Sequence, residues 1–200
     1  MKAAERGLNA GIIGPQLLMF EHPPTITMGL SAKESSLLVR PDELESRSIE
    51  FRKTDRGGDA TWHGPGQLVG YPIVNLIECR LSVPSFVKAI EEGLIGWLQS
   101  NGLESMRIEG KPGVWVTPGK KIASIGVKVS GGITTHGFAL NLTGSLEGSD
   151  AILPCGFSHV KLTTLEIEKA TSISTRASAA GVSSELSAAL GMEYEFQDLS

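Results

Sequence analysis

The chain of 200 residues is long enough for one domain with a sizeable hydrophobic core. Its 40% hydrophobic residues, mean hydropathy of +0.03 and net charge of −4 are typical of a globular protein; no apolar run is long enough to span a membrane, and the charge argues against a dedicated nucleic-acid binder. With only two cysteines, we expect neither a disulfide framework nor a cysteine metal site. Because no apolar leader segment is seen either, we expect the protein in a reducing cytoplasm.

The N-terminal part of the chain predicts short elements separated by turns. Residues 1–14 have the small and polar side chains of a frayed helix, and the apolar run at 17–20 predicts a strand that ends before two prolines. Alternating β-branched residues at 25–29 predict a second strand. Pro41 and the acidic residues after it predict the start of a helix.

The middle of the chain predicts a strand followed by an amphipathic helix. Residues 67–76 are strand-like, and Pro72 within them favours a sheet edge or a bulge. Apolar residues then recur every three or four positions from Val87 to Leu98, which predicts a helix with one buried face that ends at Gly102.

The remaining elements decide the predicted fold class. Residues 114–116 and 122–129 predict a hairpin around a Pro-Gly turn, 134–142 a further strand, and 184–190 a last helix. Strands outnumber helices and pair locally, so we expect an α+β fold, a mixed and largely antiparallel sheet flanked by helices, as a single domain over residues 1–200.

Cys155 is the candidate nucleophile. Pro154 and Gly156 on either side predict an exposed turn that a substrate can approach closely. The alternative is a small buried hydrophobic residue, as most lone cysteines are. Cys79 has no comparable neighbours, and we expect it to be structural.

A reactive thiolate needs a cation beside it, and the residues alone leave several candidates open. Histidines at positions 22, 63, 136 and 159 are each flanked by residues that do not rank them. Lys121, which opens a strand after the predicted Pro-Gly turn, is the other candidate. Its alternative interpretation is a solvated turn lysine.

Glycine is unusually frequent, with 24 residues in 200, about 12% against an average of roughly 7%. The densest packet is RGGDATWHGPGQ at 56–67, which is neither a Walker A loop nor a dinucleotide-binding loop. It predicts either a loop whose backbone amides line a substrate cavity or a glycine-rich turn between strands.

At this packet the sequence resembles a known family. RGGDATWHGPGQLVGYPIVNL at 56–76 is similar to the signature of the lipoyl (octanoyl) transferases, within the lipoate/biotin protein ligase superfamily. Further blocks that follow the family order lie at 21–29, 113–116, 121–126, 136–141 and 154–156. The chain departs from the usual family residues at Asp59, Trp62 and the glycine pair 131–132.

The resemblance implies the fold of a biotin/lipoate ligase catalytic domain and a specific set of site residues. The acyl-thioester cysteine falls on Cys155 and its lysine partner on Lys121, which settles the choice of lysine over histidine. The implied substrate-binding residues are Arg56, Gly57, Gly58, Asp59, Ala60, Thr61, Trp62, His63, Ser124, Ile125, Gly126, Gly137, Phe138 and Ala139.

The resemblance also implies the reaction and its partners. An octanoyl group would move from octanoyl-acyl carrier protein, through a thioester on Cys155, to one lysine of a lipoyl domain, as the first step of lipoate synthesis. The acceptors would be the lipoyl domains of 2-oxoacid dehydrogenases and the glycine cleavage H protein. No cofactor, metal, nucleic acid or membrane is expected.

Two other functions compete with this one. An ATP-dependent lipoate or biotin ligase of the same superfamily activates a free acid as an adenylate and needs no cysteine nucleophile. A non-catalytic carrier-binding protein with the same fold predicts the loss of Cys155 or Lys121. Both residues are present, which favours the transferase.

Overall fold

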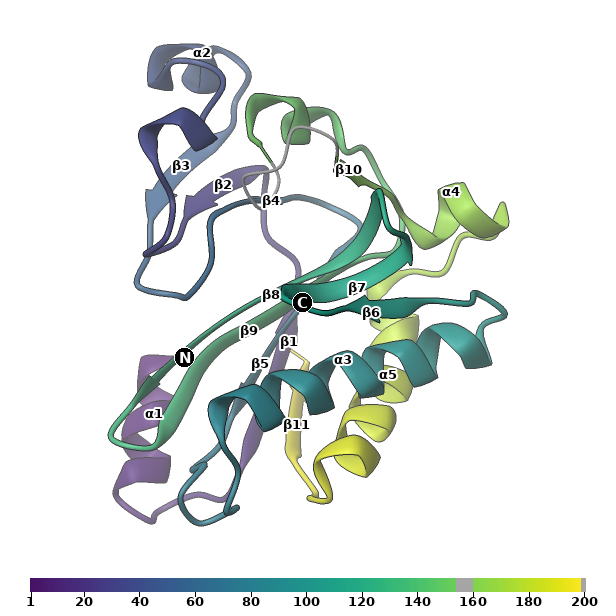
Figure 1. The fold of residues 1–200 in the computed structure, drawn as a ribbon. Helices are drawn as coiled ribbons and strands as arrows, with labels where there is room; N and C mark the ends of the chain where they lie inside the picture. The colour runs from purple at the N-terminus through teal and green to yellow at the C-terminus, as the bar shows by residue number, and fades with distance from the viewer. Residues whose placement is uncertain (154–159, 199–200) are drawn as a thin grey trace.

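The structure, a computed structural model, describes residues 1–153 and 160–198 of the chain. Within these residues a large mixed sheet forms the body of the molecule, and a smaller sheet of three strands lies above it in the view of Figure 1. None of the helices in this described part combines the length and the apolar character needed to cross a membrane.

The strands of the large sheet lie in the spatial order β11–β1–β5–β9–β8–β7–β6, with β10 beside β8. Neighbours are antiparallel, except that β1 runs parallel to β11 and β8 parallel to β10. These strands are β1 (Gln16–Phe20), β5 (Gln67–Ile73), β6 (Met106–Ile108), β7 (Lys111–Thr117), β8 (Lys120–Ser130), β9 (Ile133–Asn141), β10 (Lys161–Leu162) and β11 (Glu195–Asp198).

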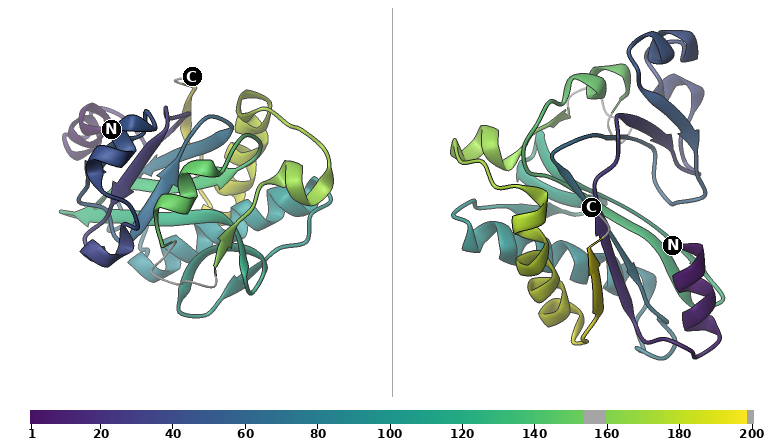
Figure 2. Two further views of the ribbon diagram at one scale, coloured as in Figure 1. Left: turned by 90° about the horizontal axis from the view of Figure 1, so that it is seen from above. Right: turned by 180° about the vertical axis from the view of Figure 1, so that it is seen from behind.

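Helices cover both faces of this sheet. Side chains along each strand point alternately to the two faces and therefore pack against different helices. Leu17 and Met19 of β1 belong to the main core with α3 and α5, whereas Leu18 between them packs with Leu8 of α1. Figure 2 shows α1 and the α3–α5 pair on opposite sides of the sheet. The helices are α1 (Lys2–Asn9), α2 (Pro41–Ser46), α3 (Val83–Ser100), α4 (Leu165–Lys169), α5 (Thr175–Leu190) and the short 3₁₀ helices η1 (Glu34–Ser36) and η2 (Glu147–Ala151).

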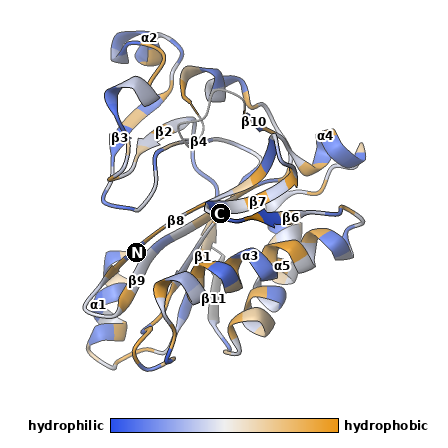
Figure 3. Ribbon diagram, viewed as in Figure 1, coloured by the Kyte–Doolittle hydropathy of each residue, from blue (hydrophilic) through white to orange (hydrophobic). Residues whose placement is uncertain are grey.

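The two long helices begin and end at residues suited to those positions. The Ser82 and Ser174 hydroxyls accept hydrogen bonds from the first-turn N–H groups of α3 and α5, and Gly191 closes α5 at a φ of +64°. Hydrophobic and hydrophilic residues alternate along both helices (Figure 3), as expected where one face is buried against the sheet.

The small sheet has the strand order β3–β2–β4 and a hydrophobic cluster of its own. Its strands are β2 (Thr25–Met28), β3 (Glu50–Lys53) and β4 (Ala60–His63). Ile26, Leu44 and Trp62 lie in this cluster, which also receives Ile152 from the segment after η2. The small sheet therefore packs against the segment around η2, which follows strand β9 of the large sheet.

The α+β class and the largely antiparallel large sheet are confirmed, with several local corrections. The edge position predicted from Pro72 is wrong, because β5 lies between β1 and β9; the ladder to β9 ends at the pair Gly70–Phe138, before Pro72. The helix predicted at 184–190 begins at Thr175, since small Ala and Ser residues hide its apolar pattern. The strands β3, β4, β6, β10 and β11 were not predicted.

Candidate active site

Two adjoining cavities lie where the small sheet faces the large one. The first, here called the histidine cavity, has a volume of about 220 Å³ and histidines 22, 63 and 136 in its walls. The second, the lysine cavity, has a volume of about 250 Å³ and contains Lys121. The two cavities share four lining residues, namely Arg56, Thr61, Ser124 and Ile125.

The floor of the histidine cavity comes from the paired strands β8 and β9. Their register sets Ser124 opposite Ala139, Ile125 opposite Phe138 and Gly126 opposite Gly137. Two segments predicted to bind substrate are therefore side by side and line one cavity. They present mostly apolar groups and backbone, which suits a hydrocarbon chain.

Glycine is needed in this floor because other backbone comes very close. A Cβ on Gly137 would lie 2.2 Å from the Gly70 carbonyl oxygen. A Cβ on Gly126 would lie 2.7 Å from the Gly57 carbonyl oxygen. Any side chain at these positions would push the loop of Gly57 or strand β5 away from the floor.

Arg56 lies between the two cavities and is only 7% exposed. Its Nε and Nη2 donate to the Thr27 hydroxyl at 3.2 and 2.8 Å, and Nη2 also donates to the Thr27 carbonyl at 2.8 Å. The loop after it is fixed by a 2.9 Å bond from the Gly57 N–H to the Val127 carbonyl and by Gly58 at a φ of +88°. The buried guanidinium thus places a positive charge at the junction of the cavities.

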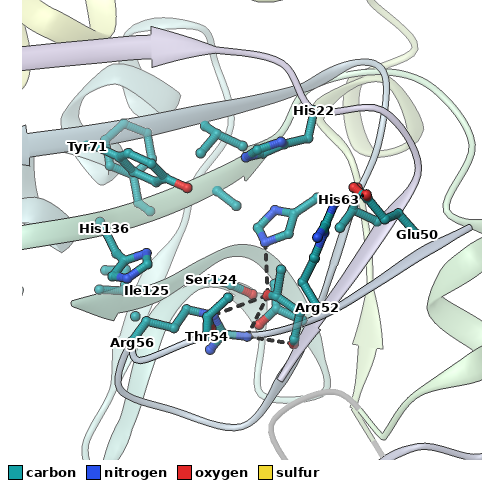
Figure 4. A pocket seen from close by; sticks show the side chains of 18 residues that line it. His22, Glu50, Arg52, Thr54, Arg56, His63, Tyr71, Ser124, Ile125 and His136 are labelled. Carbon is teal, nitrogen blue, oxygen red and sulfur yellow. Dashed lines mark hydrogen bonds and ion pairs between the residues drawn. The ribbon is translucent and has the colours of Figure 1, made fainter. Parts of the chain in front are cut away.

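His63 is buried in the wall of the histidine cavity (Figure 4). Its Nδ1 lies 2.8 Å from Gln67 Oε1 and its Nε2 3.2 Å from the Thr27 hydroxyl. Burial lowers the pKa of His63 to about 3, so the ring is neutral at neutral pH. The His22 ring lies 5.4 Å away, and burial lowers its pKa as well.

His136 lies at another side of the same cavity and contacts the Asp55 carboxylate. Its Nε2 is 2.8 Å from Asp55, and the same carboxylate binds Lys128 at 2.7 Å. Hydrogen bonds from Lys128 and then from His136 lower the pKa of Asp55 to about 2. His136 has a φ of +58°, a left-handed conformation that is uncommon outside glycine.

Lys121 is buried, with 2% of its surface exposed, so the interpretation as a solvated turn lysine is wrong. Its Nζ donates to the Pro112 carbonyl at 2.7 Å and lies 5.0 Å from the centre of the Trp115 ring. Close by, the Glu91 carboxylate accepts from the Gly113 N–H at 2.8 Å, and burial raises the pKa of Glu91. The Lys121 side chain thus lines the lysine cavity, held by a backbone carbonyl and an aromatic ring.

The chain that follows Cys155 is anchored beside this lysine. Leu162 of β10 pairs with Lys121, and the Thr163 N–H donates to the Lys121 carbonyl at 2.9 Å. Cys155 itself and His159 lie outside the described residues. Within the described ranges, no group of three or more His, Cys, Asp or Glu side chains is arranged to hold a metal ion.

The predicted substrate-binding residues divide between the cavities, with two exceptions. Gly58, Asp59 and Ala60 line the lysine cavity, whereas Gly57 and Trp62 line neither. Trp62 points away because side chains alternate along β4, and it packs in the small hydrophobic cluster. Residues 60–63 of the glycine-rich packet thus form strand β4, and the packet is not a loop throughout.

Several polar residues at this site were not predicted. Thr27 and Tyr71 line the histidine cavity, and Gln67 and Asn141 lie directly behind its wall. All four residues fall within blocks that resemble the transferase family, and this resemblance is the signal that could have indicated them.

Comparison with known proteins identifies the class. The family model of the lipoyl protein ligase A/B catalytic domain matches residues 3–187, and the chain belongs to this family. It is 45% identical over 172 residues to an octanoyltransferase of Acidobacterium capsulatum, which covers 80% of this chain and 70% of that protein. It is 46% identical over 168 residues to an octanoyltransferase of Chloroflexus aurantiacus, covering 83% of this chain and 74% of that protein.

Solved structures confirm the predicted fold. A bipartite lipoate protein ligase from Thermoplasma acidophilum, studied with its E2 lipoyl domain, superposes with a TM-score of 0.77 at 15% identity, covering 99% of this chain and 81% of that one. A lipoate-protein ligase A bound with ATP gives a TM-score of 0.76 at 15% identity, over 99% of this chain and 83% of that one. A biotin protein ligase from Aquifex aeolicus gives 0.51 at 13% identity, over 86% and 70%.

Proposed function

We infer that this chain is an octanoyltransferase, an acyltransferase of lipoate synthesis and protein lipoylation. Relatives that are 44–46% identical over about four fifths of the chain carry this activity in their names. The buried Lys121 cation, in a cavity that adjoins one with an apolar floor, is the structural observation that best supports it. The donor we propose is octanoyl-acyl carrier protein. The acceptors are the lipoyl domains of 2-oxoacid dehydrogenases and the glycine cleavage H protein, in the cytoplasm.

The proposed reaction runs through two acyl transfers. The Cys155 thiolate attacks the thioester carbonyl, the carbon–sulfur bond to the carrier breaks, and the carrier thiolate leaves with a proton from Lys121. The neutral amine of the acceptor lysine then attacks the Cys155 thioester. Its proton passes to Lys121, and the Cys155 thiolate leaves as the amide forms. No ATP is consumed, because the thioester is already an activated acyl group.

The other proposed residues would hold the substrate. The eight-carbon chain would lie along Ser124–Gly126 and Gly137–Ala139 in the histidine cavity, where burial stabilises it by about 0.8 kcal/mol per methylene. Arg56 and Thr61, which both cavities share, would then flank the thioester. In this arrangement, the reacting carbonyl lies between the apolar floor and Lys121.

A transfer assay separates this function from the ligase alternative. Purified protein is mixed with octanoyl-carrier protein and a lipoyl domain, and the mass of the lipoyl domain is followed without ATP. We expect one octanoyl group on the domain. Modification that requires ATP and free octanoate would instead identify a ligase, and no modification with either donor would support a non-catalytic carrier-binding protein.

A further inference from the structure

A directed chain of hydrogen bonds runs behind the wall of the histidine cavity and ends on Arg56. It begins at Asn141, whose Nδ2 donates to the Thr163 carbonyl at 3.0 Å. Because a carbonyl only accepts, this bond fixes the orientation of the Asn141 amide and turns its Oδ1 toward Gln67.

The Gln67 amide is fixed in the same way. Its Nε2 donates to the Trp62 carbonyl at 3.0 Å and to Asn141 Oδ1 at 2.8 Å, and both of these atoms accept only. Gln67 Oε1 therefore faces His63, and the 2.8 Å contact between them requires His63 Nδ1 to carry the proton.

The tautomer of His63 in turn sets the direction of the Thr27 hydroxyl. With its proton on Nδ1, the neutral ring has a bare Nε2 that accepts from the Thr27 O–H at 3.2 Å. Both lone pairs of this hydroxyl then point to the N–H groups of Arg56, at 3.2 Å from Nε and 2.8 Å from Nη2. Each donor and acceptor of the Thr27 hydroxyl is thus used once.

The far end of the chain lies beside the proposed catalytic lysine, because the Thr163 N–H donates to the Lys121 carbonyl. Asn141, Gln67 and His63 are buried at 3, 5 and 8% exposure, so water does not compete for their hydrogen bonds. The chain thus connects the strand that carries Lys121 with the guanidinium at the junction of the cavities.

We propose that Thr27 is a positioning residue for acyl transfer: its hydroxyl, oriented by Asn141, Gln67 and neutral His63, fixes the Arg56 guanidinium where the acyl thioester is held. The proposal rests on the proposed function for its kinetic consequence. Its structural part, the tautomer of His63 and the restraint on Arg56, is independent of any activity.

Protonation of His63 would break this arrangement, since Nε2 would become a donor to a hydroxyl that already accepts two N–H groups. The charged and titratable groups that face His63 are Arg56, the His22 ring on the segment before β2, and His136 on β9. All three disfavour a second positive charge when they are protonated. The neutral state of His63 is thus supported from each of these sides.

The structural part is tested by nuclear magnetic resonance on the full chain labelled with ¹⁵N. The His63 signal is assigned by its absence in His63→Asn. We expect the Nδ1–H tautomer, unchanged between pH 5 and 8, and an Arg56 Nε–H that exchanges slowly in the wild type and faster in Thr27→Val. An Nε2–H tautomer, a charged ring at neutral pH, or equal exchange in both proteins would overturn the proposal.

The kinetic part compares Thr27→Val, which keeps the shape of the side chain without its hydroxyl, with Thr27→Ser, which keeps the hydroxyl without the methyl group. The valine variant should raise the KM for octanoyl-carrier protein about tenfold with a smaller change in kcat, and serine, which keeps the hydroxyl, should restore the KM to within about twofold. Thr134→Val is the control: this buried hydroxyl, 2.7 Å from the Pro72 carbonyl, lies in neither cavity, so only thermal stability should fall.

The outcomes separate the proposal from the function on which it rests. A wild-type KM in Thr27→Val, or equal loss in the valine and serine variants, would refute a positioning role while transfer by the wild type persists. If the wild type transfers no octanoyl group, the proposed function fails. The tautomer of His63 and the exchange of Arg56 Nε–H then decide whether the chain of hydrogen bonds exists.

Discussion

The two sheets contribute different things to the site. The large sheet supplies long, continuously paired strands, and β8 and β9 are in register from Ala123–Leu140 to Ser130–Ile133 above a core covered by α3 and α5. The small sheet has strands of four residues; β2 and β4 supply Thr27 and His63, and the segment between β3 and β4 supplies Arg56. The large sheet thus forms the apolar floor and carries Lys121, while the small sheet and the segment that contains Arg56 provide polar groups on the other side of the cavities.

The contrast extends to how each part holds its cations. Lys121 of the large sheet is fixed by a backbone carbonyl and an aromatic ring. Arg56, in the segment between β3 and β4, is held by hydrogen bonds to Thr27. Thr27 is linked in turn through His63 and Gln67 to Asn141 in the large sheet. Chemistry would therefore depend most on the large sheet, and recognition most on the contact between the two.

The largest expected effect comes from the large sheet. Lys121→Met removes the buried cation and keeps much of its volume, and we expect octanoyl transfer to fall by about a thousandfold, the scale of a lost general acid–base. Alkylation of Cys155 by iodoacetamide at neutral pH should slow in parallel. Both are measured on protein whose fold is checked by circular dichroism.

The neighbouring lysine is the matched control. Lys120 is half exposed and pairs with Glu168 at 3.1 Å, so Lys120→Met should keep transfer and alkylation near the wild-type rates. If Lys120→Met is the damaging change, the assignment of the catalytic lysine is off by one residue. If neither variant loses activity, a histidine is the activating group.

A smaller loss of activity is expected from a change at Gly58, in the segment between β3 and β4. Gly58→Val puts a β-branched side chain at a φ of +88°, in the wall of the lysine cavity and 3.5 Å from Arg56 Nη1. The KM for octanoyl-carrier protein should rise by about tenfold to a hundredfold. Gly131→Val carries similar strain, at a φ of +57°, in the turn between β8 and β9. Equal kinetics in the two variants would show that Gly58 acts only through stability.

The last effect concerns stability and pH, with no loss of activity expected at neutral pH. The pKa of His63 is about 3 in the folded state and 6.5 as a free side chain, so between these values the unfolded chain binds a proton that the folded protein does not. The free energy of unfolding therefore falls as pH falls from 6.5 toward 3, and His63 contributes about 1.4 kcal/mol per pH unit.

The variant His63→Asn isolates this contribution in urea titrations between pH 4 and 8. Its free energy of unfolding should fall less steeply below pH 6.5, while its difference from the wild type stays constant above pH 7. Identical slopes in the two proteins would mean that His63 titrates normally in the folded state and does not stay neutral at the wall of the cavity.

The sequence predicted the elements of the large sheet better than those of the small one. The hairpin of β7 and β8 follows from its Pro-Gly turn, but irregular pairing at Trp115–Lys121 and Thr117–Lys120 decides which lysine points inward. The family resemblance placed Trp62 in the substrate site, but Trp62 packs in the small hydrophobic cluster. The face of β4 on which it lies depends on the pairing of β2, β3 and β4, which was not predicted. Gln67 and Asn141 are 74 residues apart, and no local pattern indicates their hydrogen bond.

The central claim is that an acyl group passes through Cys155, and mass spectrometry tests it most directly. The protein is incubated with octanoyl-carrier protein without ATP, digested, and its two cysteine peptides are compared. We predict one octanoyl group on Cys155, which disappears when a lipoyl domain is added, and none on Cys79, whose pKa is raised by burial and then by Glu78. Transfer to the lipoyl domain without any adduct on Cys155, or an adduct on Cys79 that the domain removes, would contradict the claim.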